Sequence, residues 1–178
     1  MTRAPRRGPV ASGTADAHAM LRFRPLAARD QDKLWHWLHV ALWDPPPAGP
    51  RPVAVLQSQG VRIYAEDWGR PTDVGVVACV DNVDAGACWM RLLPDGAGLA
   101  FVDARTPQLG IALEPAFQRS GYGQPLLQAA LAAAGGAGYR QVSLTVHPEN
   151  PAIRLYERCG FRKVERRSGY ELMVAALA

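Results

Sequence analysis

The stretch "AFQRSGYGQPLL" (residues 116–127) places two glycines two positions apart in a loop between a strand-like run and a helix-like run. The run before it is "LGIAL" (109–113), and the run after it is "PLLQAALAAA" (125–134). A helix start exposes unpaired backbone N–H groups at the positive end of the helix dipole, and glycines let a bulky pyrophosphate approach the backbone. A tight turn between strand and helix would explain the glycines equally well.

Two common phosphate-binding loops do not fit this stretch. A dinucleotide-binding fold requires a third small residue where Leu126 stands, together with further strand-helix units on both sides. A P-loop requires Gly-Lys-Ser/Thr, whereas Gly123 is followed by Gln124 and Pro125. Both of these nucleotide-binding classes are therefore excluded.

The segments after the loop alternate between helix and strand patterns. The helix ends at the glycine-rich "GGAG" (135–138), and "QVSLTV" (141–146) alternates like a strand. "NPAIRLYERCG" (150–160) has Asn at the N-cap, Pro at the first helical position and Gly after the last turn. "FRKVERR" (161–167) and "YELMVAA" (170–176) predict a terminal pair of strands.

The segments before the loop begin with a strand and a helix. "LRFRPL" (21–26) alternates like a strand, and Asp30 introduces a helical pattern. The proline-rich 44–52 must be irregular, and 53–64 has helical spacing weakened by Gly60. Residues 73–80, 86–93 and 108–113 predict strands, the first two joined by a turn at 81–85. The whole order is β-α-α-β-β-β-α-β-α-β-β, an α/β fold whose mostly antiparallel sheet contains one right-handed, parallel strand-helix-strand unit.

Length and composition predict one folded domain with a tail. A chain of 178 residues with 48% hydrophobic content suits a single core. Residues 1–20 mix Pro, Gly, Ser and Arg without apolar periodicity, so we expect a mobile N-terminal tail followed by a single domain at 21–178. Three arginines in that tail, against one aspartate, supply half of the net charge of +4, so the charge does not indicate nucleic-acid binding.

The sequence carries no pattern for a membrane segment or a metal site. No run of about eighteen apolar residues and no signal-peptide h-region is present, so we expect a cytoplasmic protein that does not contact a membrane. Cys79, Cys88 and Cys159 lack C-x-x-C spacing and lie in apolar surroundings. We expect buried free thiols and no bound metal.

The stretch Gln118-Arg119-Ser120-Gly121-Tyr122-Gly123 resembles the acyl-CoA pyrophosphate loop, Gln/Arg-x-x-Gly-x-Gly/Ala, of the GNAT superfamily of N-acyltransferases. "SLTVHPENPAIRLYERCGF" (143–161) resembles the second signature of that family, on which Asn150, Ala152, Tyr156 and Gly160-Phe161 fall. The resemblance covers nearly all of the chain after the tail. It implies about seven strands flanked by about four helices, with the parallel pair splayed, usually at a bulge, to form the acyl-CoA cleft.

The resemblance implies a binding site for acetyl-CoA as co-substrate. The backbone of Ile111, Ala112 and Leu113 would bind pantetheine and the thioester carbonyl, and Asn150 would contact the same arm. Asn150 is explained equally well as an N-cap, and Arg119 as a solvated loop residue. The amides that would bind pyrophosphate are those of Gln118, Arg119, Ser120, Gly121, Tyr122, Gly123 and Gln124.

The implied chemistry is attack of a neutral amine on the thioester in a ternary complex. Tyr156 occupies the position of the family's usual general acid, although a core tyrosine would fit the same short helix. A thiol of pKa near 8.5 leaves readily, so we expect the acid to contribute modestly. Glu114 and His147 are the candidate general bases, and each has an alternative as a solvated residue at a strand end.

The amine acceptor is not indicated by any motif. In the family the acceptor groove is usually formed by the first two helices, their connection and the last strand pair. This implicates residues 44–52 and four tryptophans that are also good core residues: Trp35, Trp37, Trp43 and Trp68. We expect an N-acetyltransferase of an unidentified amine, compatible with a homodimer. The alternatives are a catalytically silent acyl-CoA-binding regulatory module and an interaction subunit that docks a partner through exposed tryptophans.

Overall fold

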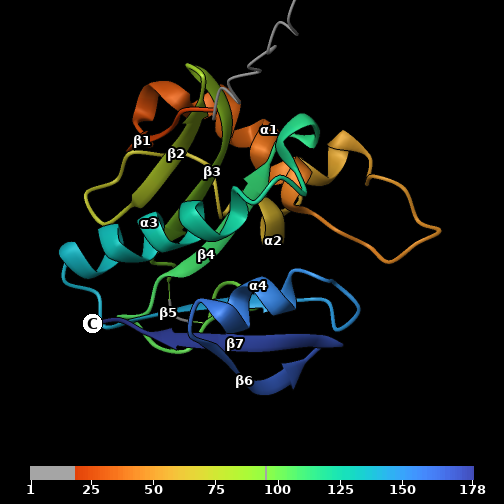
Figure 1. Ribbon diagram of the computed structural model, residues 1–178. Coiled ribbons are helices and arrows are strands. Elements are labelled where there is room, and N and C mark those ends of the chain that lie inside the picture. The colour runs from red at the N-terminus through yellow and green to blue at the C-terminus, as the bar shows by residue number, and fades with distance from the viewer. Residues whose placement is uncertain (1–18, 95) are drawn as a thin grey trace, which may run out of the picture.

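The computed structural model describes residues 19–94 and 96–178, which form one mixed sheet with helices on both faces (Figure 1). The strand order is β1-β2-β3-β4-β5-β7-β6. The strands are β1 (Leu21–Pro25), β2 (Val74–Val80), β3 (Val83–Arg91), β4 (Gln108–Leu113), β5 (Gln141–Val146), β6 (Phe161–Arg167) and β7 (Tyr170–Ala176). The α-helices in this part of the chain are α1 (Gln31–Ala41), α2 (Gln59–Arg62), α3 (Gly123–Gly136) and α4 (Ile153–Arg158). The predicted element order and fold class are confirmed.

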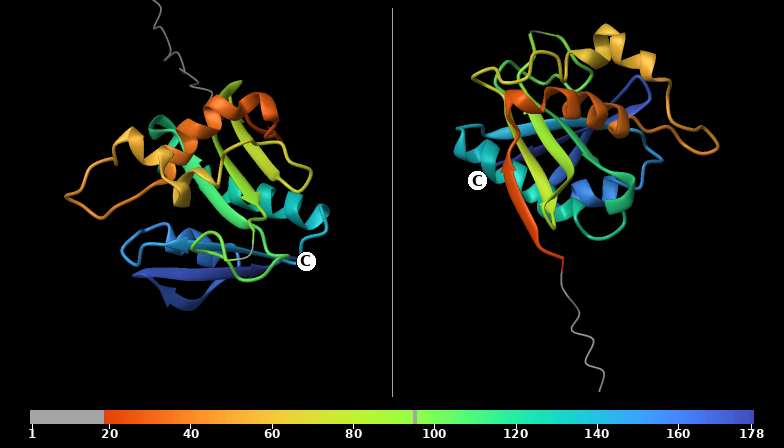
Figure 2. Two further views of the ribbon diagram at one scale, coloured as in Figure 1. Left: turned by 180° about the vertical axis from the view of Figure 1, so that it is seen from behind. Right: turned by 90° about the horizontal axis from the view of Figure 1, so that it is seen from above.

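The sheet separates two apolar cores. Helices α3 and α4 lie in front of the sheet in Figure 1, and α1 and α2 cover the opposite face, which Figure 2 shows from behind. Alternate residues of a strand face opposite sides, so Met90 of β3 packs on the α3 side while its neighbour Trp89 packs on the α1 side. Trp37 and Trp68 belong to the second core and are 1% and 5% exposed.

Strands β4 and β5 form the parallel pair, and they separate soon after they meet. Their register contains one residue pair, Gln108 with Ser143, beyond which the strands diverge (Figure 1). On its other side β4 stays paired with β3 from Gln108 to Leu113 without a shift in register. The predicted splay is confirmed, and it requires no bulge in β4.

Two predicted segments have different boundaries in the structure. The connection between β2 and β3 is only Asp81-Asn82, because both residues have positive φ (48° and 67°), as a two-residue hairpin turn requires. The prediction of a turn at 81–85 was therefore too long. The helical segment 53–64 is interrupted at Ser58, whose ψ is 135°, and divides into a 3₁₀-helix (Val53–Gln57) and α2.

The cysteines and tryptophans are more enclosed than exposed. All three cysteines are free, as predicted, but only Cys88 is buried, whereas Cys79 and Cys159 are half-buried. None of the five tryptophans is exposed. An interaction subunit that docks a partner through exposed tryptophans therefore has no basis in this fold.

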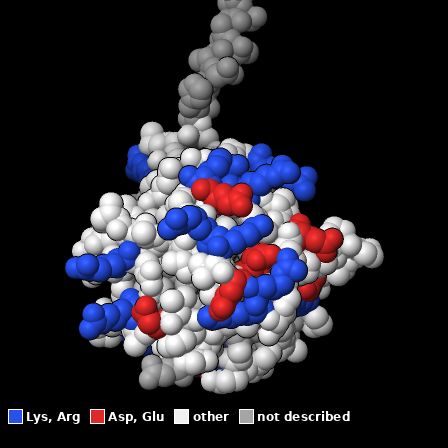
Figure 3. Space-filling view, turned by 90° about the horizontal axis from the view of Figure 1, so that it is seen from below, with Lys and Arg blue, Asp and Glu red and all other residues white. Residues whose placement is uncertain are grey.

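The face on which β6 lies carries many basic side chains with acidic ones between them (Figure 3). Arg166 pairs with Glu171 at 2.6 Å, and Arg167 pairs with Glu165. No helix in the described residues is long and apolar enough to cross a membrane. The predicted tail lies outside the described residues up to position 18; Met20 already exchanges hydrogen bonds with Asp81.

Candidate active site

A cavity of about 290 Å³ occupies the gap between the splayed strands. Residues 109–111 of β4 form one wall, and residues 144–146 of β5, with His147, form the other. Tyr156 of α4 and residues 41–43 at the end of α1 also contribute. The cavity therefore joins the α1 face of the sheet to the α3 and α4 face.

The backbone of β4 supplies unpaired groups to this gap. The N–H of Glu114 donates to Ala85 of β3 at 2.8 Å, and because backbone groups alternate along a strand, those of Ala112 also face β3. Ile111 and Leu113 therefore face the gap, and the Leu113 carbonyl accepts a hydrogen bond from Gln118 Nε2 at 2.9 Å. Of the three residues predicted to contact pantetheine, Ala112 is the one whose backbone points away from the gap.

The glycine loop presents a row of free amides at the start of α3. Arg119 and Gly121 have φ of 58° and 84°, in the left-handed region that favours glycine. No described residue accepts a hydrogen bond from the backbone N–H groups between Arg119 and Gln124. The N–H of Gln118 donates to Pro115 at 3.3 Å, so the free row begins one residue later than predicted.

Asn150 lines the cavity and also closes the turn before α4. Its Oδ1 accepts the N–H of Ala152 at 2.9 Å, a contact that closes a turn two residues along the chain. Because α4 begins only at Ile153, with Ala152 at its N-cap, the prediction of Asn150 as the N-cap is wrong. The Nδ2 group makes no hydrogen bond with a described residue. This turn contact orients the Asn150 side chain and leaves its Nδ2 donor group free.

Tyr156 is both a core residue and part of the cavity wall. Its side chain is 9% exposed and packs edge-on against Phe161, with ring centroids 5.8 Å apart. Burial, with a smaller contribution from Cys88, raises the pKa of Tyr156 far above its usual value. Its hydroxyl has no hydrogen-bond partner among the described residues. The phenol is therefore neutral and its proton is not committed to another protein group.

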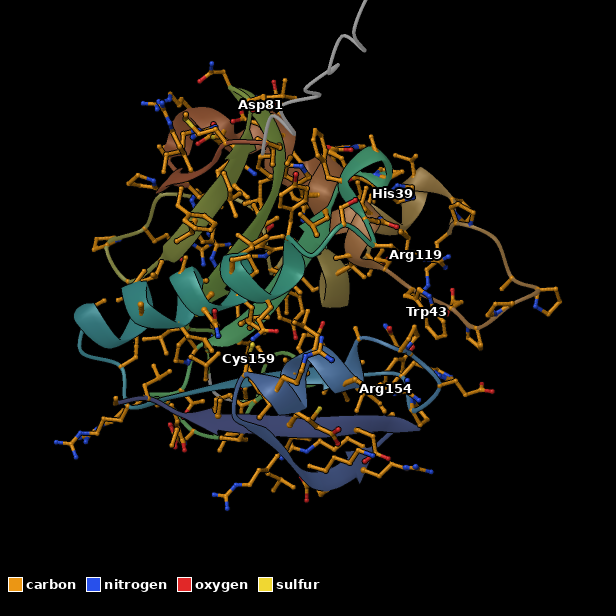
Figure 4. All side chains as sticks on the ribbon, viewed as in Figure 1. His39, Trp43, Asp81, Arg119, Arg154 and Cys159 are labelled. Atoms are coloured by element: carbon orange, nitrogen blue, oxygen red, sulfur yellow. The ribbon has the colours of Figure 1, made fainter. Side chains whose placement is uncertain are left out.

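His147 lies between two aromatic rings at the other side of the cavity. Its ring centroid is 5.6 Å from that of Trp43, labelled in Figure 4, and 5.9 Å from that of Tyr170. Nδ1 accepts the backbone N–H of Glu149 at 3.1 Å. The neutral imidazole therefore carries its proton on Nε2.

Glu114 does not lie with His147 and Tyr156. It follows β4 on the sheet face that packs against α1, where Oε1 accepts from Trp37 Nε1 and Oε2 from His36 Nε2, both at 2.9 Å. It borders a separate surface depression with Lys33. The structure thus brings together Tyr156, His147 and Asn150, and separates Glu114 from them.

The region that contains these features matches a known family. Residues 35–161, from α1 to the start of β6, match the acetyltransferase (GNAT) family. The chain belongs to this family. The match includes the glycine loop and both walls of the cavity, as the two sequence motifs predicted.

A curated relative of this GNAT chain is the mycothiol acetyltransferase of Nocardiopsis dassonvillei. The two are 30% identical over 143 residues, which is 79% of this chain. The aligned segment amounts to 42% of the relative, so the chain spans less than half of that protein's length.

Solved structures of other proteins have the same GNAT fold. The GNAT domain of S. lividans PAT superposes with a TM-score of 0.63 at 18% identity, covering 88% of this chain and 90% of that one. The ribosomal-protein-S18-alanine N-acetyltransferase of Escherichia coli gives 0.62 at 20% identity, covering 89% and 95%. PaiA N-acetyltransferase of Thermoplasma acidophilum, in complex with coenzyme A, gives 0.61 at 14% identity, covering 88% and 99%. At these identities the likeness establishes the fold alone.

Several residues in the wall of the GNAT cavity were not predicted as site residues. Arg51, Tyr64 and Tyr170 were not singled out, although they lie in segments implicated in the acceptor groove, whereas Trp89 and Gly110 lie outside those segments. For Gly110 and Trp89 the sequence did contain a signal. A glycine inside a strand often marks a place where another group packs close to the backbone. A Cβ at Gly110 would lie 2.6 Å from the Trp89 ring, so the indole occupies the space that a side chain would need.

Proposed function

We propose that this protein is an N-acetyltransferase that transfers an acetyl group from acetyl-CoA to an amine by direct attack in a ternary complex. The observation that carries the proposal is the strand gap with its unpaired backbone at Ile111, flanked by Tyr156. The free amides from Arg119 to Gln124 at the start of α3 complete the site. Membership of the GNAT family supports the same reaction class.

The residues present fit acetyl-CoA. The amides from Arg119 to Gln124 would hold the pyrophosphate at the positive end of α3. Ile111 and the N–H of Leu113 would pair with the amides of pantetheine, and the Nδ2 group of Asn150 would donate to the same arm. When bound, acetyl-CoA supplies the thioester acetyl group and a thiol leaving group.

Two side chains would move the protons. Tyr156 would donate its phenolic proton to the departing sulfur, and it is available because burial keeps the phenol neutral. His147 would take a proton from the attacking amine at Nδ1, through water, in place of the amide of Glu149. An α-amine of pKa near 8 needs only about 1 kcal/mol to be neutral at pH 7, whereas a lysine amine needs about 4 to 5 kcal/mol. An acceptor whose amine has a low pKa is therefore easier for His147 to deprotonate.

Coenzyme A should stabilise the folded protein. If it is supplied at about a hundred times its dissociation constant, the free energy of unfolding should rise by about 2.7 kcal/mol. A thermal melt with and without saturating coenzyme A measures this effect, with ATP at the same concentration as the control. A melting temperature that does not change with coenzyme A would contradict the assignment of the glycine loop.

His147→Gln should lower turnover at pH 7 by about 10²-fold, the low end of the effects of a general base. The difference in turnover between His147→Gln and the wild type should become smaller toward pH 9, where more of the amine is already neutral. Glu114→Gln is the matched control and should keep the wild-type pH profile. The opposite pattern, with Glu114→Gln impaired and His147→Gln normal, would transfer the base role to Glu114.

The catalytically silent regulatory module is distinguished by the products. Release of free coenzyme A together with an acetylated amine establishes the transferase. A protein that binds acetyl-CoA but transfers to no amine in a broad set would be the silent module.

A further inference from the structure

Arg51, which lines the cavity together with Tyr170, has one guanidinium nitrogen without a protein partner among the described residues. Arg51 donates from Nε and Nη2 to the two oxygens of Asp44, at 2.7 and 2.8 Å. Nη2 also donates to the Tyr170 hydroxyl at 3.3 Å. Nη1 makes no hydrogen bond with a described residue, so its two N–H groups are available to a ligand.

A second free donor is buried in the same wall. Trp89 Nε1 is the one fully buried side-chain nitrogen or oxygen in the described residues that lacks a hydrogen-bond partner. Trp89 is 0% exposed and lines the cavity. A buried donor without a partner costs free energy, and this one lies in a residue of the cavity wall.

Carboxylate groups that could bind a positively charged ligand are scarce around the cavity. Among the described residues that line it, none is Asp or Glu. The nearby Asp44 has both oxygens bound by Arg51, and these hydrogen bonds lower its pKa. His147 Nδ1 is occupied by the Glu149 amide, which leaves Nε2–H as a further donor. A second positive charge on the acceptor would find no partner here, whereas an anionic oxygen would find several.

The segment that carries Arg51 is fixed in place. His39 of α1, labelled in Figure 4, hydrogen-bonds through Nε2 to the Arg51 carbonyl at 2.6 Å. Asp44 and Tyr170 hold the guanidinium from two sides. Arg51 is therefore oriented before any ligand binds, which favours a directed contact with a planar carboxylate.

We propose that the acceptor is an amine that also carries a carboxylate, and that Arg51 Nη1 binds this carboxylate. The inference rests on the proposed transferase function and specifies its acceptor class. A free amino acid or a short peptide supplies the carboxylate that would bind Arg51, and the α-amine of a peptide also has the lower pKa that suits His147. Polyamines, which bring extra positive charge and no anionic group, are the disfavoured class.

A matched set of acceptors tests this proposal. Free amino acids with small, aromatic and acidic side chains are compared with the corresponding amino acid amides and with spermidine. Coenzyme A release and the acetylated product are both measured. We expect kcat/KM, calculated per neutral amine, to be at least about tenfold higher for the best amino acid than for its amide, as one lost charge-assisted hydrogen bond predicts. An amide or spermidine used as well as the best amino acid would overturn the proposal but leave the transferase function standing.

Variants of Arg51 test whether this residue causes the preference for an amino acid over its amide. In Arg51→Gln the ratio of kcat/KM between amino acid and amide should fall to about one, and Arg51→Lys should retain part of it. Because Arg51 also holds Asp44, the double variant Asp44→Asn with Arg51→Gln removes the unpaired carboxylate, and the melting temperature of each variant is measured. A ratio unchanged in a folded double variant would overturn the role of Arg51. Coenzyme A binding without transfer to any acceptor would instead contradict the proposed function itself.

Discussion

Tyr156→Phe should lower turnover by up to about 10²-fold, while coenzyme A affinity and melting temperature barely change. The substitution removes only the hydroxyl, which has no partner among the described residues, and keeps the ring packed on Phe161. No protein group is therefore left unsatisfied by the change. The loss stays at the low end of general-acid effects because a thiolate leaves without much help. Single-turnover measurement isolates the chemical step.

The matched control for this variant is Tyr139→Phe. The Tyr139 hydroxyl donates to the Thr72 carbonyl at 2.6 Å and lies outside the strand gap. Its removal should cost some stability and no turnover. If Tyr156→Phe keeps full turnover when chemistry is rate-limiting, or loses activity only in step with stability, Tyr156 is a core residue and not the acid.

Gly121→Val should weaken coenzyme A binding by about 10²-fold and leave a folded protein. Gly121 has φ of 84°, which a β-branched residue adopts only with strain of about 1–3 kcal/mol. A Cβ there meets no atom within 4 Å, so the substitution creates no clash inside the protein. The branched side chain would instead turn the loop amides and obstruct the approach of a phosphate. Calorimetric titration with coenzyme A measures the change.

Gly138→Val provides the control at the opposite end of α3. Gly138 has φ of 94° and equally open surroundings, so the substitution imposes a similar backbone strain far from the free amides. It should lower stability without changing coenzyme A affinity. Equal affinities in Gly121→Val and Gly138→Val would mean that Gly121 serves only the turn.

The features that could be predicted from the sequence are local or carried by the two motifs. The strand and helix order follows from periodicity and from glycine and proline positions, and the splayed pair follows from the family resemblance. The length of the turn between β2 and β3 was overestimated, because Val83 and Asp84 can be assigned to a strand only once the pairing partner of β3 is known. The backbone direction of Ala112 and the separation of Glu114 from His147 depend in the same way on strand alternation against β3.

The segments around the amine-acceptor end of the cavity follow from the family resemblance, but the contacts between their residues could not be predicted, because these residues meet only in three dimensions. Arg51 and Tyr170 are 119 positions apart in the chain, and Trp89 belongs to a strand that carries neither motif. Four tryptophans were considered for this role, of which Trp37 and Trp68 are core residues and Trp43 lines the cavity. Residue type alone does not show whether a tryptophan lies in the core or lines the cavity, because this depends on which face of the sheet it packs against.

The splay of β4 from β5 gives this sheet four edges instead of two. Exposed edges invite another strand to pair, and proteins discourage this with charge and proline. The outer edges follow that rule: β6 is rich in exposed Arg and Lys, and β1 contains Arg22, Arg24 and Pro25. The inner edges carry no such charges along residues 109–111 and 144–146. They are enclosed by helices from both faces of the sheet, so the only strand-like partner with room to enter is a thin chain with few side groups.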